Sequence, residues 1–134
     1  MSGIATASLL PEPARRRHDE ETLHRAVWRY LQWALPADAC AYHPANGGKR
    51  HPKAAARMAG LGVVPGVPDL AIVWRGQAIY IELKAGRGVL SDAQREMQRL
   101  LVYCGAQVIT CRSLTCVEES LRELGIPLRA SVAA

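Results

Sequence analysis

The apolar positions of the chain change period along its length. Between Asp19 and about Leu35, apolar side chains recur at helical spacing, at Leu23, Val27, Leu31 and Ala34. Asp19 fits the N-cap position, and Pro36 cannot continue a helix. Residues 70–74 and 78–83 are instead runs of strand-forming side chains, separated by Arg75-Gly76. The pattern therefore predicts a first helix and, further along the chain, a β-hairpin with a tight turn.

Capping residues and turn formers predict the remaining elements. We expect strands at 39–43 and 106–110, a short helix at 53–61, and helices at 91–103 and 115–124. The order is then α-β-(short α)-β-β-α-β-α, an α/β arrangement. The sequence shows no internal repeat and no interdomain linker. We therefore expect one domain at 19–128, a flexible N-terminal tail at 1–18 and a C-terminal tail at 129–134.

The positive charge of the chain is concentrated in one part of the sequence. The 134 residues carry 17 Lys+Arg against 12 Asp+Glu, a net charge of +5. Residues 22–68 hold six of these cations and a single acid, Asp38, so this middle third carries the excess. A basic zone suits a polyanion such as nucleic acid, but a solvated basic face would look the same.

Composition excludes several classes of protein. Hydrophobic residues make up 49% and charged residues 22%, which is typical of a globular domain and not of a disordered chain or a coiled coil. No apolar run approaches the roughly 20 residues of a membrane span, and the N-terminus lacks a secretory pattern. We expect a soluble protein of the cytoplasm. The cysteines lack Cys-x-x-Cys spacing, which argues for free thiols: Cys40, Cys104, Cys111 and Cys116.

The hairpin brings two acids together. If Arg75-Gly76 is a two-residue turn, the paired residue numbers sum to 151, and Asp69 then lies directly opposite Glu82. Lys84 shares a face with Glu82, because strand side chains alternate. Two carboxylates in this position repel each other unless a cation such as Mg²⁺ or Mn²⁺ lies between them. The alternative is a solvent-exposed hairpin end with an ordinary Glu-Lys pair.

These residues also resemble a known family. Pro68-Asp69 followed by Glu82-Leu83-Lys84 is similar to the PD-(D/E)XK nuclease signature, and the chain as a whole resembles the VRR-NUC (virus-type replication-repair nuclease) family. The likeness spans about residues 20–124 and is closest in form to small, stand-alone phage and bacterial members. Its elements are Glu20, Asn46–Arg50, Gly66–Leu70, Ile81–Lys84 and Ser91-x-x-Gln94. It implies a restriction-endonuclease-like α-β-β-β-α-β core, with a central mixed sheet flanked by helices.

The resemblance implies a role for each site residue. Asp69, Glu82 and the backbone carbonyl of Leu83 would bind Mg²⁺, with Mn²⁺ able to substitute, and Lys84 would position or activate the attacking water. Glu20 would approach the site through a second metal or a water, and Glu21 is the alternative on the same helix. Gln94 would support the site by hydrogen bonding.

Other polar residues fit contacts to a DNA backbone. The loop offers backbone N–H groups and two cations, at Asn46, Gly47, Gly48, Lys49 and Arg50. Lys53 and Arg57 are four residues apart and share a helix face. His43 and His51 flank the loop, as phosphate ligands or as structural residues. Few aromatic residues lie in this zone, so we expect backbone recognition without base specificity.

The expected function is a metal-dependent DNA endonuclease that hydrolyses phosphodiester bonds in branched DNA. By resemblance, the substrate is the four-way (Holliday) junction and the enzyme is a homodimer, with a place in DNA repair or in a phage or prophage within a bacterial cell. Trp28, Trp33 and Trp74 are candidates for the dimer surface or for the core. Two alternatives stay open: a nuclease for flaps, nicks or defence, and a DNA-binding module without catalysis.

Overall fold

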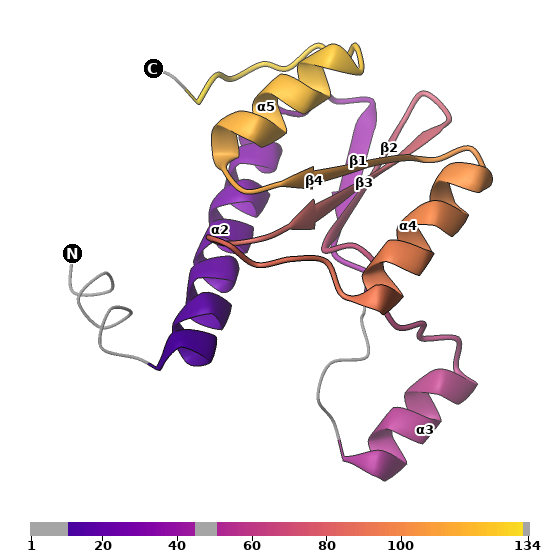
Figure 1. The fold of residues 1–134 in the computed structure, drawn as a ribbon. Helices are drawn as coiled ribbons and strands as arrows, with labels where there is room; N and C mark the ends of the chain where they lie inside the picture. Colours follow the sequence, from indigo (N-terminus) through magenta and orange to yellow (C-terminus); the bar gives the residue numbers. More distant parts are fainter. Residues whose placement is uncertain (1–10, 45–50, 133–134) are drawn as a thin grey trace. The chain divides into compact units, whose positions relative to one another are not determined.

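The computed structural model describes residues 11–44 and 51–132. Its elements confirm the predicted order (Figure 1). They are helix α2 (Glu12–Ala34), strand β1 (Ala39–Tyr42), helix α3 (Pro52–Gly60), strands β2 (Leu70–Trp74) and β3 (Gln77–Leu83), helix α4 (Asp92–Tyr103), strand β4 (Gln107–Cys111) and helix α5 (Leu114–Glu123). The four strands form one sheet in the order β1-β2-β3-β4.

The chain forms two compact units. Among the described residues, the first contains 11–39, 83–89 and 110–132, and the second contains 40–44, 51–82 and 90–109. Helices α2 and α5 therefore belong to the first unit, and helices α3 and α4 with the β2–β3 hairpin belong to the second. Each unit is described in turn.

In the first unit, α2 packs against α5 (Figure 1). The helical stripe predicted from the sequence supplies the buried side chains of α2, among them Val27 and Leu31. Val117 and Leu121 of α5 are likewise fully buried. Removing these aliphatic side chains from water is the main source of stability for such a pair of helices.

Helix α2 begins seven residues before the predicted start at Asp19, so residues 12–18 are helical and do not form a tail. Proline misled the prediction here. Pro11 is the N-cap residue and Pro13 falls in the first turn, where its missing N–H costs no helical hydrogen bond. Glu12 is well placed in that turn and pairs with Arg16 one turn later.

The C-terminal segment, predicted as a tail at 129–134, is attached to the first unit as far as the described residues extend. The Arg129 amide donates to the Ala34 carbonyl at 2.8 Å, and the Tyr30 hydroxyl donates to the Ala130 carbonyl at 2.8 Å. The Val132 amide donates to the Glu118 carboxylate at 2.8 Å. The sequence alone does not show these contacts, since residues 129–132 lack a strand or helix pattern.

In the second unit, the predicted hairpin register is confirmed. Trp74 pairs with Gln77 and Leu70 pairs with Ile81, both antiparallel. The turn residues have positive φ, 48° at Arg75 and 77° at Gly76, as a two-residue turn of the I′ type requires. The Arg75 guanidinium lies 5.1 Å from the centre of the Trp74 ring, and Trp74 is buried rather than surface-exposed.

Candidate functional site

The open end of the hairpin carries the two predicted acids. The antiparallel pairing of β2 with β3 ends at Leu70 and Ile81, one step before Asp69 and Glu82. Continuing that register by one residue places Asp69 opposite Glu82. Glu82 is only 2% exposed, and Asp69 is half-buried. A buried carboxylate in a strand needs compensating partners, because an ionised carboxylate loses its hydration on burial.

Gln94 is one such partner of Glu82. Its side-chain Nε2 donates to Glu82 Oε1 at 3.2 Å. Its Oε1 accepts from the Ser91 amide at 2.8 Å, and its own amide donates to Ser91 Oγ at 3.1 Å. These last two bonds form a capping box at the start of α4. The side-chain amide of Gln94 thus joins the helix start to the acidic strand end.

Gly66 allows the segment before Asp69 to approach the start of α4 closely. Its φ is +83°, and an added Cβ would overlap the Ala93 carbonyl oxygen and lie 2.8 Å from the Gln94 amide nitrogen. Only glycine fits both the backbone conformation and the close approach. The Gly66-Val67-Pro68 turn therefore packs directly against the first turn of α4.

His43 holds the backbone at Asp69. Its Nδ1 lies 2.6 Å from the Asp69 carbonyl oxygen. A carbonyl oxygen only accepts, so Nδ1 carries the proton in this contact. One ring nitrogen of His43 is therefore structural, which favours that alternative over a role confined to phosphate binding.

Lys84 and Glu20 lie in the first unit. Lys84 follows Glu82 by two residues and is 9% exposed, and its amide donates to the Cys111 carbonyl at 3.0 Å. Glu20 is half-buried on α2, with its Oε1 beside Gly88 in the segment after β3. Glu21 is exposed and pairs with Arg25 at 2.9 Å. Of the two helix acids, only Glu20 faces this segment.

The donor set at the hairpin end suits a hard divalent cation. Asp69, Glu82 and the Leu83 carbonyl offer oxygen atoms only, and Mg²⁺ commonly takes one or two carboxylates and completes its shell with water. Within residues 11–44 and 51–132, no three His, Cys, Asp or Glu side chains cluster as a ready-made metal cage. Carboxylate oxygens are the ligand type of hard divalent cations, whereas structural zinc sites are built from Cys and His.

The predicted DNA contacts fall into two groups. Asn46, Gly47, Gly48, Lys49 and Arg50 lie outside the described residues. Lys53 and Arg57 are exposed on α3, a helix with no buried residue. His51 caps that helix, since its Nδ1 accepts from the Lys53 amide at 3.2 Å. It is therefore a structural residue in this respect.

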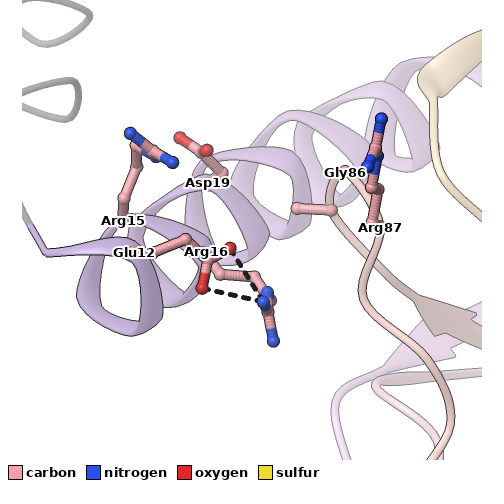
Figure 2. Close-up of a pocket in the computed structure, with 7 residues that line it drawn as sticks. Glu12, Arg15, Arg16, Asp19, Gly86 and Arg87 are labelled. Carbon is pink, nitrogen blue, oxygen red and sulfur yellow. Dashed lines mark hydrogen bonds and ion pairs between the residues drawn. The ribbon is translucent and has the colours of Figure 1, made fainter.

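The structure also shows a cavity that sequence reasoning missed. In the first unit, Arg15 and Arg16 of α2 share it with Arg87, which follows β3 (Figure 2). Arg15, Arg16 and Arg17 follow one another in the sequence, but they fall in the predicted tail at 1–18, which gives no reason to relate them to Arg87. The two sets are about seventy residues apart, and no local pattern connects them.

The sheet with its helices and the acidic hairpin end followed by lysine match the pattern of PD-(D/E)XK nucleases, and the domain family of the chain implies a nuclease of this type. The VRR-NUC domain profile matches residues 10–114, and the chain belongs to the VRR-NUC family. A solved structure described as a "VRR_NUC domain protein" has a similar fold, with a TM-score of 0.57 and 18% sequence identity. The similarity covers 77% of this chain and 84% of that chain. No curated protein matches the sequence.

The family match confirms the predicted fold, a mixed sheet flanked by helices, and the predicted class of enzyme. A nuclease acts on nucleic acid, and nucleases of this kind generally use a divalent metal. Across the described residues, no helix has both the length and the apolarity to cross a membrane.

Proposed function

We propose that this protein is a Mg²⁺-dependent endonuclease that cuts branched DNA, with the four-way junction as its substrate and a homodimer as its active form. The observation that supports the catalytic part is the buried carboxylate of Glu82, which Gln94 holds and which lies opposite Asp69 when the hairpin register is continued by one residue. A binding module without catalysis has no use for two acids brought together at this cost.

In this proposal, Asp69, Glu82 and the Leu83 carbonyl hold Mg²⁺, and Mn²⁺ can replace it. When bound there, the ion would supply Lewis acidity toward the scissile phosphate and would lower the pKa of a bound water. Lys84 orients the attacking water and offsets the negative charge that develops on the phosphate. Gln94 fixes the orientation of Glu82 through the hydrogen bond at 3.2 Å. Glu20 assists through a water or a second cation.

The DNA backbone is held by exposed cations in this proposal. Phosphates are contacted by Lys53 and Arg57 of α3, by the Asn46–Arg50 loop and by His43. Contacts to phosphates position DNA without reading its sequence. The resemblance to small stand-alone members supports the junction, the dimer, a role in DNA repair or phage biology, and a place in the bacterial cytoplasm. The nuclease domain spans 19–128 with the additional helical turns from Glu12.

The test is cleavage of a labelled panel of four-way junctions, flaps, nicked duplexes and linear duplex, in Mg²⁺ and in EDTA. Parent protein is compared with Asp69→Ala, Lys84→Ala and the exposed-acid control Glu119→Ala. We expect cleavage of junctions by the parent and the control only, lost in EDTA. If both site variants cut as fast as the parent, the site is assigned wrongly.

The same panel separates the alternatives. Preferential cutting of flaps or nicks would replace the junction as substrate. Binding without cleavage in any metal would leave only a DNA-binding module. The molar mass of the protein on the junction, measured by light scattering, tests the homodimer.

A further inference from the structure

Two cysteines of the first unit face each other where β4 leads into α5 (Figure 1). Cys111 is the last residue of β4, and Cys116 lies in the first turn of α5. Both are free thiols in the structure, and their sulfur atoms lie 2.7 Å apart. A disulfide bond is about 2.05 Å long, so the two sulfur atoms need to approach by only about 0.7 Å to be joined.

The backbone on both sides of this pair is held by hydrogen bonds. The Cys116 amide donates to Ser113 Oγ at 3.1 Å, and the Val117 amide donates to the Ser113 carbonyl at 3.2 Å. Ser113 is thus the N-cap that fixes the start of α5. The Cys111 carbonyl accepts from the Lys84 amide at 3.0 Å. Both cysteines are therefore anchored, and their sulfur atoms stay within reach of each other.

The two thiols differ in exposure. Cys111 is only 1% exposed, whereas Cys116 is half-buried. Burial also raises the pKa of the Cys111 thiol to about 12, so this thiol keeps its proton at neutral pH. The thiolate is the reactive form of cysteine. A dissolved oxidant therefore reaches Cys116 first, and Cys111 lies beside it as the second thiol of the pair.

A serine hydroxyl accompanies both sulfur atoms. Ser120 follows Cys116 by one turn of α5, and its Oγ lies 3.8 Å from Cys111 Sγ and 4.0 Å from Cys116 Sγ. A hydroxyl can donate a hydrogen bond to sulfur. Ser120 can thus stabilise the negative charge that either sulfur carries while it reacts.

We propose that Cys111 and Cys116 are a redox modification site, at which a peroxide converts the two thiols into a reversible disulfide. A reactive thiol with a second thiol beside it is the usual arrangement of cysteines that respond to oxidants. The proposal uses no part of the metal site, and it holds whether or not the protein cuts DNA.

The reaction has two steps. The Cys116 thiolate attacks one oxygen of hydrogen peroxide, the O–O bond breaks, and the sulfur becomes a sulfenic acid. The departing hydroxide takes up the proton that Cys116 released and leaves as water. The Cys111 sulfur then attacks the Cys116 sulfur, the S–O bond breaks, and the Cys111 proton leaves with that oxygen as a second water. The thiols lose two hydrogen atoms in total, and a dithiol reductant reverses the change by exchange.

The bridge would act on the strand end that holds Lys84. It would close a ring of the six residues 111–116, which restricts the ways in which this segment can open. The Lys84 amide is bonded to the carbonyl of Cys111 within the same unit. We therefore expect the Lys84 amide to exchange its hydrogen more slowly in the oxidised protein than in the reduced protein.

The test starts from the reduced full chain, treated with an equimolar amount of hydrogen peroxide. Remaining thiols are blocked with N-ethylmaleimide in denaturant, and the product is analysed by mass spectrometry. We expect the parent to lose two hydrogen atoms and two thiols within one chain, and to regain both thiols in dithiothreitol. Cys116→Ser should form no link within the chain. The urea midpoint of the oxidised parent should exceed that of its reduced form by roughly 1 M.

Peptide mapping needs a matched control. Trypsin cuts after Arg99, Arg112 and Arg122, which separates the two cysteines, but peptide 100–112 also contains Cys104. Cys104→Ser removes an exposed cysteine of the second unit and leaves Cys111 as the only cysteine of that peptide. A link between peptides 100–112 and 113–122 in this variant can then join only Cys111 and Cys116.

Absence of that link in Cys104→Ser would overturn the proposal, as would links only through Cys40 or only between two chains. Oxidation that stops at a sulfenic or higher acid of Cys116, with Cys111 still a thiol, would also overturn it. Equal exchange at Lys84 in both redox states would refute the effect on the strand end. Circular dichroism checks the fold of each variant, and if Cys116→Ser is unfolded, the peptide map of Cys104→Ser decides alone.

Discussion

Replacing Gly66 by alanine should destabilise the protein and disturb the candidate site together. The added Cβ would overlap the Ala93 carbonyl oxygen and lie 2.5 Å from the Ala93 carbonyl carbon. It would also force an L-residue into a φ of +83°. The neighbouring atoms are backbone atoms at the start of α4, so they cannot move aside by changing a rotamer.

The magnitude has two parts. A left-handed conformation costs an alanine about 1–2 kcal/mol. Forcing an extra methyl into a filled space typically costs a further 1–3 kcal/mol. Gly62→Ala isolates the first part, because Gly62 has a φ of +95° and an added Cβ there would meet nothing within 4 Å. The difference in the free energy of unfolding between the two variants therefore measures the cost of the close approach alone.

Urea unfolding followed by circular dichroism is the assay. With a slope of about 2 kcal/mol per molar urea, a difference of about 2 kcal/mol between the variants separates their midpoints by roughly 1 M. Because Ala93 and Gln94 would be displaced, we also expect Gly66→Ala to lose more nuclease activity than Gly62→Ala when both are folded. Equal midpoints for the two variants would refute the argument that the turn packs tightly on α4.

Three further predictions concern the first unit. Leu31→Ala, at a side chain only 1% exposed, should cost about 2–5 kcal/mol in urea unfolding, and an effect below about 1 kcal/mol would contradict its core position. Burial, followed by the hydrogen bond shared with Cys116, raises the pKa of the Cys111 thiol to about 12. Its thiolate fraction at pH 8 is then about one in ten thousand, so iodoacetamide should label the exposed Cys40 and Cys104 first in peptide mass spectrometry, and early labelling of Cys111 would contradict this. The hydrogen bond from the Val132 amide is the main cause that lowers the pKa of Glu118. The ionised Glu118 carboxylate therefore stabilises the folded protein at pH values above its unfolded-state pKa, and this stabilisation is lost as pH falls through the lowered pKa. Glu118→Gln should speed amide exchange at Val132 at neutral pH, with Glu119→Gln as the exposed control, and equal exchange in both would argue against the anchor.

The hairpin could be predicted from the sequence because its information is local. Two runs of strand formers and a two-residue turn determine the register, and the period of two along each strand then determines which side chains share a face. The hairpin register therefore predicts from residue numbers alone that Asp69 and Glu82 lie opposite each other. The order of the helices and strands follows from similarly local signals of capping and periodicity.

Other features depend on contacts that local patterns do not encode. The start of α2 was misplaced because Asp19 resembles a cap, while Pro11 and Pro13 resemble a tail and yet suit a first helical turn. The attachment of residues 129–132 depends on a tyrosine and a glutamate far away in sequence. Likewise, Arg15 and Arg87 line the same cavity only because the fold brings their two segments together.

Residue 94 illustrates how a short motif can carry two requirements at once. For the helix alone, glutamate and glutamine are interchangeable at the third position of a capping box, because either side-chain oxygen accepts from the N-cap amide. At this position the second end of the side chain meets Glu82, and only an amide has a hydrogen to donate there. A glutamate would keep the helix start and set two carboxylates against each other. Glutamine instead of glutamate at residue 94 is thus explained by a long-range contact. The sequence can be interpreted in this way once Glu82 is known to lie beside the helix start.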